Sequence, residues 1–272
     1  MKKYVGLFIA WGLFLLSAVA FAAANYEENV VEAEGYGLSA AGSATEVQAR
    51  LTARRAAIAD AQRVLAEELA AVQVDAETRV EDAALKSDVV QTKVTALLKG
   101  CRVVRESYED GAYRVTVAVP LFGERSLAAA ALPRKSGRQP FPLAASLSHD
   151  EAAEEYGPRE PVESGPYTGL ILDCRGLDLR PAMSPVIKTT AGEPIYGYKN
   201  LDSAEVIRRG MAGYAHTFED NTARAGENPL ILRAAGVDRY FNPVITAEDG
   251  GWILRENEKT HFLDKAAVVF VR

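Results

Sequence analysis

The sequence predicts an α+β protein made of two small α/β modules in tandem. The first half contains a long alanine-rich helical pattern followed by a β-hairpin, and the second half has more short apolar strands than helices. Between them, residues 123–166 are rich in proline, glycine and charge, which is typical of a flexible linker. We therefore expect a first module over 34–122 and a second module over 167–272.

The chain begins with the pattern of an export signal. Lys2 and Lys3 precede an almost wholly apolar stretch, and small-x-small cleavage sites follow within 20–24. We expect a cleaved signal peptide over 1–24. An uncleaved anchor is the alternative, because 4–24 has about the 20 residues that span a bilayer. We expect an exported protein in the periplasm or at the outer-membrane periphery of a bacterium.

The charge of the chain limits its partners. It carries 31 Lys and Arg against 37 Asp and Glu, a net charge of −6. Nucleic-acid binding depends on neutralising phosphates, so no nucleic-acid partner is expected. The sequence also has no polybasic patch for anionic lipid, so membrane contact is expected only through an uncleaved signal segment. Basic residues 134–138 and acidic residues 150–163 in the linker are expected to be solvated.

A long helix is expected over 42–73. Its predicted start is the capping box Ser43-Ala44-Thr45-Glu46, in which side chains bond to the free amides of the first turn. Apolar residues then recur at helical spacing: Val47, Leu51, Ile58, Ala61, Leu65, Leu69 and Val72. A helix of about 30 residues is marginal by itself, so a neighbouring element must cover this stripe.

The remaining elements of the first module supply that cover. A short strand is expected over 36–40, and a second helix over 85–98. Strands over 101–108 and 113–121 are expected to form a hairpin about Glu109-Asp110-Gly111. One face of the second hairpin strand is expected to cover the long helix, through Tyr113, Val115, Val117 and Val119. This arrangement places helices on one side of an antiparallel sheet.

These features resemble a known family. The helix contains Ala-Arg-Arg-Ala-Ala-Ile-Ala-Asp-Ala (53–61), and the hairpin reads Glu-Asp-Gly-x-Tyr-x-Val-x-Val-x-Val-Pro-Leu (109–121). Together they resemble the lipoprotein-20 family and the related N-terminal module of flagellar assembly protein T, over 34–122. The resemblance implies an envelope protein without known catalysis, with flagellar basal-body or outer-membrane components as candidate partners. This chain has no cysteine near its cleavage region, so the resemblance does not extend to lipidation.

The second module is expected to be a strand-rich mixed α/β domain. Its expected elements are a buried strand at 168–172, a hairpin of 185–190 with 194–198, a helix capped by Asp202, and strands at 228–234 and 266–271. The segment 244–256 has two interpretations: a hairpin turning at Asp249-Gly250-Gly251, or a helix.

Candidate catalytic groups follow the first strand of the second module. Asp173 and Arg175 lie directly after it, at a place where active-site groups often occur. With His216, Asp238 or His261 they could form a hydrolytic constellation of acid, base and orienting group. The interpretation that we favour is a structural pair anchoring the next turn, because no nucleophile lies at motif spacing.

The sequence contains no pattern for a metal or a cofactor, and none is expected. The three histidines (His149, His216 and His261) are widely spaced, and no glycine-rich phosphate loop is present. Cys101 and Cys174 lie in different halves of the chain. Export permits a disulfide between them, but Cys is commonly a small buried hydrophobe, so two free thiols are the interpretation that we favour.

The expected function is therefore that of a non-enzymatic assembly or scaffold factor of the cell envelope, with a flagellar role as one option. The alternative is a periplasmic hydrolase or glycan-binding protein that uses Asp173, Arg175 and His216. Aromatic residues of the second module would serve a core, a protein contact or a glycan platform: Tyr196, Tyr198, Tyr214, Tyr240, Phe241 and Trp252.

Overall fold

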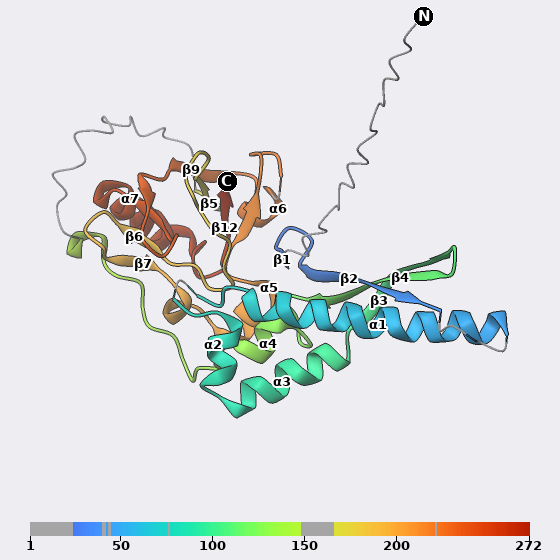
Figure 1. The fold of residues 1–272 in the computed structure, drawn as a ribbon. Helices are drawn as coiled ribbons and strands as arrows, with labels where there is room; N and C mark the ends of the chain where they lie inside the picture. The colour runs from blue at the N-terminus through green and yellow to red at the C-terminus, as the bar shows by residue number, and fades with distance from the viewer. Residues whose placement is uncertain (1–23, 40–41, 43–44, 76, 148–165, 221) are drawn as a thin grey trace, which may run out of the picture.

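The computed structural model describes residues 24–39, 42, 45–75, 77–147, 166–220 and 222–272. The first module is an antiparallel sheet in the order β1-β2-β4-β3, with α1 packed along β2 and β4 (Figure 1). Its elements are β1 (Ala24–Asn25), β2 (Val30–Leu38), α1 (Glu46–Ala71), α2 (Val80–Leu85), α3 (Asp88–Lys99), β3 (Arg102–Glu109), β4 (Ala112–Pro120) and α4 (Leu127–Ala131).

Helix α1 packs directly on the backbone of β2, because the residues that face each other are small. A Cβ atom at Gly37 would lie 2.1 Å from the carbonyl oxygen of Ala53. One at Gly35 would lie 2.1 Å from the backbone nitrogen of Ala61. Both distances are far below van der Waals contact, so glycine is required at positions 35 and 37 of the strand. The buried stripe of α1 is accordingly small at its start: Ala53, Ala57, Ala61, Leu65 and Leu69.

The predicted stripe and cap of this helix are therefore wrong at its first turns. Val47 and Leu51 are 69% and 53% exposed, because alanines face the glycines of β2 in their place. The N-cap residue is Thr45, whose side chain accepts a hydrogen bond from the Gln48 backbone nitrogen at 3.1 Å. The predicted capping residue, Ser43, lies outside the described residues.

The predicted hairpin is confirmed, and the face of β4 that carries Tyr113, Val115, Val117 and Val119 is buried. Two other elements differ from expectation. Strand β2 starts at Val30 rather than at 36. The sequence does not reveal its first half, because the residues on its buried face are mostly small (Ala and Gly) and give only a weak apolar alternation. The predicted second helix is two helices, because Ser87 caps a new start at α3, and Leu85 is left exposed.

The second module contains two four-stranded sheets, which confirms the mixed α/β class. A parallel sheet has the order β8-β12-β5-β9, and a mixed sheet has the order β10-β11-β6-β7. The elements are β5 (Gly169–Asp173), β6 (Ile187–Thr189), β7 (Pro194–Tyr196), α5 (Ser203–Arg209), β8 (Gly213–Ala215), α6 (Thr222–Ala225), β9 (Pro229–Arg233), β10 (Gly236–Val237), β11 (Pro243–Ile245), α7 (Ala247–Thr260) and β12 (Val268–Val271).

The ambiguous segment 244–256 is a short strand followed by a helix, not a hairpin. Helix α7 starts after Thr246, whose side chain accepts a hydrogen bond from the Asp249 backbone nitrogen at 3.1 Å. Gly250 lies inside this helix, and a Cβ atom there would be 3.1 Å from Leu147 and 3.4 Å from Thr189. The glycine thus serves close packing of the helix instead of a turn.

The first part of the expected linker is packed rather than flexible. Helix α4 is buried in the first module, as Leu127 and Ala128 show. Further along, the Gln139 backbone nitrogen donates to the Lys199 carbonyl oxygen at 2.8 Å, and Phe141 stacks on Tyr196. Residues 148–165 lie outside the described part of the chain.

The two modules share one continuous hydrophobic core. Where they meet, the Met183 backbone nitrogen donates to the Gln73 carbonyl oxygen at 3.0 Å. The Ser184 hydroxyl donates to the Val74 carbonyl oxygen at 2.7 Å. On the sheet side, the ring of Tyr26 packs edge-on against that of Tyr214. The second module is therefore fixed to the base of the first, and α1 projects away from it (Figure 1).

Candidate functional site

The predicted candidates Asp173, Arg175 and His216 lie at one edge of the parallel sheet. Asp173 is opposite Val271 of β12, and Val271 is opposite Ala215 of β8, the residue before His216. Ligands of open α/β sheets bind at the carboxyl ends of parallel strands. Strand β12 nevertheless separates the two ends, so Asp173 and His216 are two strands apart.

Asp173 and Arg175 bond to each other. Arg175 donates from Nε and one terminal nitrogen to the two carboxylate oxygens, both at 2.9 Å, and from its backbone nitrogen at 3.1 Å. The Asp173 side chain is 13% exposed and the Arg175 side chain 50%. The guanidinium also lies over the ring of Phe218, 4.4 Å from its centre. Both carboxylate oxygens of Asp173 thus accept hydrogen bonds from Arg175, and the pair anchors the turn that follows β5.

The other predicted members each pair elsewhere. His216 Nε2 lies 3.2 Å from the Glu27 carboxylate, and His261 Nδ1 lies 3.5 Å from that of Asp264. Asp238 accepts a hydrogen bond from Lys188 Nζ at 2.7 Å, beside the mixed sheet. The structure therefore does not assemble the hydrolytic constellation from these groups. His149 lies outside the described residues, among which no group of three His, Cys, Asp or Glu could hold a metal ion.

The Asp173–Arg175 pair predicts a pH dependence of stability. The hydrogen bonds from Arg175 lower the pKa of Asp173, although burial acts in the opposite direction. An aspartate with a lowered pKa stabilises the folded state above its unfolded pKa of about 3.9, and this contribution is lost as the pH falls through the folded pKa. Between about pH 4 and pH 2 the wild-type protein should lose stability faster than Asp173→Asn. Urea unfolding of both proteins across this range measures the difference, and parallel pH profiles would contradict the prediction.

The two cysteines are free thiols, so the disulfide considered from the sequence is not formed. Cys174, the residue directly after β5, is fully buried, and burial raises the pKa of its thiol to about 12. Cys101 is partly buried between α3 and β3, and its sulfur accepts a hydrogen bond from Gln62 Nε2 at 3.6 Å. Reactivity requires the thiolate, so Cys174 should be inert in the folded protein.

We expect two thiols with very different alkylation rates. Without a reductant, the unfolded chain should take up two equivalents of iodoacetamide, because no disulfide withholds a thiol. The folded chain should take up its first equivalent at Cys101, and Cys174 should react at least about 100-fold more slowly. Peptide mass spectrometry locates the label. Uptake of less than one equivalent by the unfolded, unreduced protein would show that a disulfide exists.

The aromatic residues of the second module divide between core and surface. Tyr196 and Tyr214 are fully buried, and their hydroxyls donate to the carbonyl oxygens of Met211 at 2.6 Å and Ala182 at 3.0 Å. These two are core residues with satisfied hydroxyl groups, which removes them from any glycan platform. Tyr198 is partly exposed and lies under the Lys135 ammonium group, 4.1 Å from its ring centre.

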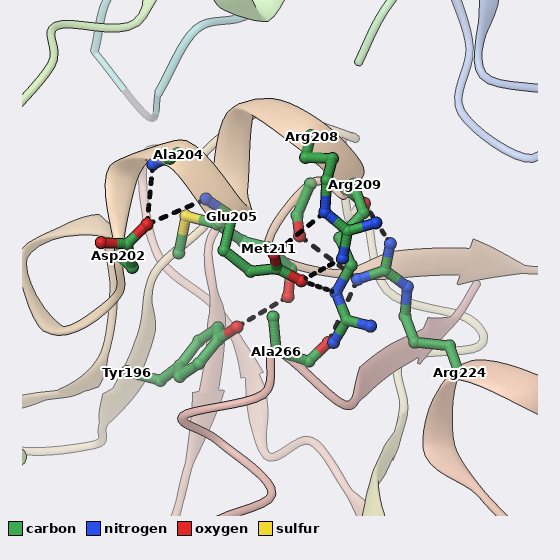
Figure 2. A network of polar contacts seen from close by, with 10 residues as sticks. Tyr196, Asp202, Ala204, Glu205, Arg208, Arg209, Met211, Arg224 and Ala266 are labelled. Carbon is green, nitrogen blue, oxygen red and sulfur yellow. Dashed lines mark hydrogen bonds and ion pairs between the residues drawn. The ribbon is translucent and has the colours of Figure 1, made fainter. Parts of the chain in front are cut away.

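A polar network at the end of α5 is centred on a partly buried arginine, Arg224 (Figure 2). Its guanidinium donates to the carbonyl oxygens of Gly210 at 3.3 Å and Ala266 at 3.1 Å, and to that of Arg209. These contacts satisfy the carbonyl oxygens at the end of α5 and the carbonyl oxygen of Ala266, which lies just before β12. Burial lowers the pKa of Arg224. The geometry is that of a structural cation, because its donors face backbone oxygens.

A groove of about 700 Å³ lies on the first module, between α3 and the segment that carries α4. Its floor is the end of β4. The edge strand β3 starts at Arg102, opposite Ala118, so Val119 and Pro120 extend past it. Small apolar residues line the floor and the walls: Ala96, Leu97, Ala118, Val119, Pro120, Ala129 and Ala130.

The groove is rich in positive charge. Four cations line it (Lys93, Arg102, Arg125 and Arg134), with Glu124 as its one carboxylate. On the sheet face turned away from α1, arginines are paired, as in Arg105 with Glu32 and Arg114 with Glu34. In the part of the chain that the structure describes, no carboxylate forms an ion pair with any of the four groove cations.

Little in the sequence indicates this groove, because the four cations come from four separate segments. Only Arg134 belongs to a visible basic run, which was expected to be solvated. In the structure the members of that run separate. Lys135 Nζ donates to the carbonyl oxygens of Tyr198 and Leu201, and Arg138 pairs with Asp264 at 2.7 Å. Of the basic residues in 134–138, only Arg134 lines the groove.

Comparison with known proteins bears on the second module. Within the described ranges, no helix is both long enough and apolar enough to cross a membrane. No curated protein matches this chain. Residues 169–272 match a family described as the second domain of Treponema pallidum Tp0624. The match runs from β5 to the end of the chain, so the second module, less than half of the sequence, is similar to that domain.

Proposed function

We propose that this chain is a non-enzymatic, exported protein of the cell envelope that acts as an assembly or scaffold factor. Its place is the periplasm or the periphery of the outer membrane. The export pattern of residues 1–24 and the resemblance of residues 34–122 to the lipoprotein-20 family support this proposal. A flagellar partner is one option that the resemblance to flagellar assembly protein T offers.

The observation that carries the proposal is the projecting end of the first module. Helix α1 has 26 residues, roughly 39 Å at 1.5 Å per residue, and its start lies far from the second module (Figure 1). Large apolar side chains are exposed at this end, where β2 finishes and α1 begins: Tyr36, Leu38, Val47 and Leu51. Tyr36 and Leu38 lie on the face of β2 turned away from α1, so the four residues border this end of the module on two sides. Exposed apolar groups on a rigid support are typical of protein-contact sites. The shared core supplies that support.

The experiment is an in-cell crosslink and pull-down of the tagged protein from the envelope fraction. We expect defined envelope proteins to be recovered with the wild type. Leu51→Ser should reduce their recovery, because it removes an apolar contact at the projecting end. The matched control is Ile231→Ser in the second module, since Leu51 and Ile231 are both 53% exposed. Recovery of the protein alone, or equal loss with both variants, would contradict the proposal.

A second candidate function is that of a hydrolase or a glycan-binding protein acting at the carboxyl edge of the parallel sheet. The observation favouring it is that Asp173, Arg175 and His216 all lie at this edge, where α/β sheets bind ligands. Binding of peptidoglycan fragments by the purified protein, lost in Asp173→Asn and retained in Asp238→Asn, would support it. If Asp173→Asn changes stability alone, the pair is structural.

A further inference from the structure

We propose that the groove between α3 and α4 is a docking site for an acidic peptide segment of a partner protein. The inference rests on the proposed function and adds the chemistry of the partner. Its occupant is a stretch of chain whose carboxylates pair with Lys93, Arg102, Arg125 and Arg134, and whose apolar side chains cover the alanine-lined floor.

The charge of the groove is the first argument. The chain as a whole is acidic, with a net charge of −6. Four cations nevertheless line the groove together with a single carboxylate, and none of the four forms an ion pair with a described residue. Arginines elsewhere in this module do find carboxylates, such as Arg54 with Glu106 at 2.8 Å. Complementary charge across an interface gives specificity and speeds association, so an anionic partner fits this surface.

The shape of the groove is the second argument, and it favours a peptide over a lipid. The cations come from α3, the start of β3, the turn before α4 and the segment after it, so the positive charge surrounds the groove instead of marking one point. A single headgroup would need its charges focused at one place, whereas a peptide carries carboxylates spaced along its length. The apolar part of the lining is built mainly of small residues.

The one side-chain hydroxyl that lines the groove is already used. The Ser126 hydroxyl donates to the Gly123 carbonyl oxygen at 2.6 Å and accepts from the Ala129 backbone nitrogen at 3.1 Å, as the N-cap of α4. Pro120 has no backbone N–H to offer. Recognition therefore falls to the four cations at the rim, and the floor contributes apolar contact.

The test uses the purified full-length mature protein and fluorescence anisotropy. The probe is a labelled peptide of roughly 12 residues that repeats Glu-Ala-Glu-Leu, compared with a control in which every Glu is Gln. We expect the acidic peptide to bind about tenfold tighter or more than its Gln counterpart, with an affinity that falls as salt is raised. Equal binding of the two peptides would overturn the proposal.

Two double variants locate the binding. Arg102→Glu with Arg125→Glu reverses two groove charges and should weaken binding of the acidic peptide about tenfold or more. Arg55→Glu with Lys86→Glu makes the same change in net charge at exposed positions away from the groove, and should change the affinity less than about twofold. Circular dichroism checks that both variants are folded. Equal losses in both would mean that net charge, and not the groove, attracts the peptide.

Two further arms distinguish the sources of failure. Sedimentation with phosphatidylglycerol vesicles tests the lipid alternative. Vesicle binding that depends on Arg102 and Arg125, without peptide binding, would overturn the peptide proposal and identify the groove as a membrane-binding site. In the envelope pull-down, partners recovered equally with the wild type and the groove double variant would leave the assembly function standing and reject the groove. Peptide binding without any envelope partner would support the groove as a peptide site and reject the assembly function.

Discussion

Gly37→Ala is expected to destabilise the protein by roughly 3 kcal/mol, at the upper end of what overpacking costs. The added methyl group would lie 2.1 Å from the Ala53 carbonyl oxygen and 2.4 Å from the Ala57 backbone nitrogen. These are backbone atoms in the middle of a helix, so no side chain can rotate to make room. The helix must move away from β2, and the contacts of its whole buried stripe loosen. Urea unfolding followed by circular dichroism measures the change.

Gly236→Ala is the matched control for this prediction. Gly236 also lies in a strand, β10, but a Cβ atom there would meet nothing within 4 Å. Its substitution should change the free energy of unfolding by less than about 1 kcal/mol. An equal unfolding midpoint for Gly37→Ala and the wild type would mean that α1 does not rest on the backbone of β2.

Arg224→Met should lower the free energy of unfolding by roughly 2–4 kcal/mol. Methionine keeps much of the length of the side chain and removes every donor. The carbonyl oxygens of Gly210 and Ala266 are then left buried without the guanidinium, and a buried polar group without a partner costs about 1–3 kcal/mol. The measurement is urea unfolding, with Arg224→Lys expected to recover part of the loss.

Arg55→Met is the control for the loss of one positive charge. Arg55 is exposed on α1, and its substitution should shift stability by less than about 0.5 kcal/mol. If Arg224→Met unfolds like Arg55→Met, the network at the end of α5 does not hold this part of the second module together.

Much of the fold follows from local sequence signals. The hairpin about Asp110-Gly111, the cap at Asp202 and the terminal strand were predicted because turn chemistry, capping and β-branched runs act over a few residues. The start of α1 was not. The buried face of α1 is determined by its contact with the glycines of β2, which lie outside the local sequence signals of the helix. Val47 and Leu51 are more apolar than the alanines that are buried, so the sequence pattern favours the wrong face. The sequence of 244–256 does not distinguish helix α7 from a hairpin, because glycine normally disfavours a helix and the benefit of Gly250 lies in packing against residues distant in sequence.

The candidate sites show the same limit. Asp173 and Arg175 stood out because they follow a strand directly, and their pairing is local. The partners of His216 and Asp238 come from residues distant in sequence, so spacing carried no information about them. The groove cations were missed for the same reason, since four scattered basic residues become a set only after α3, β3 and α4 have packed together.

Site-specific photocrosslinking in the cell tests most directly the claim that this chain binds an envelope partner through the groove of its first module. A photoreactive residue at Ala96, exposed in the groove wall on α3, is compared with one at Glu258, exposed on α7. We expect a discrete adduct with an envelope protein from Ala96 and none from Glu258, and loss of that adduct when Arg102 and Arg125 are changed to Glu. No adduct from Ala96, or the same adducts from both positions, would contradict this claim.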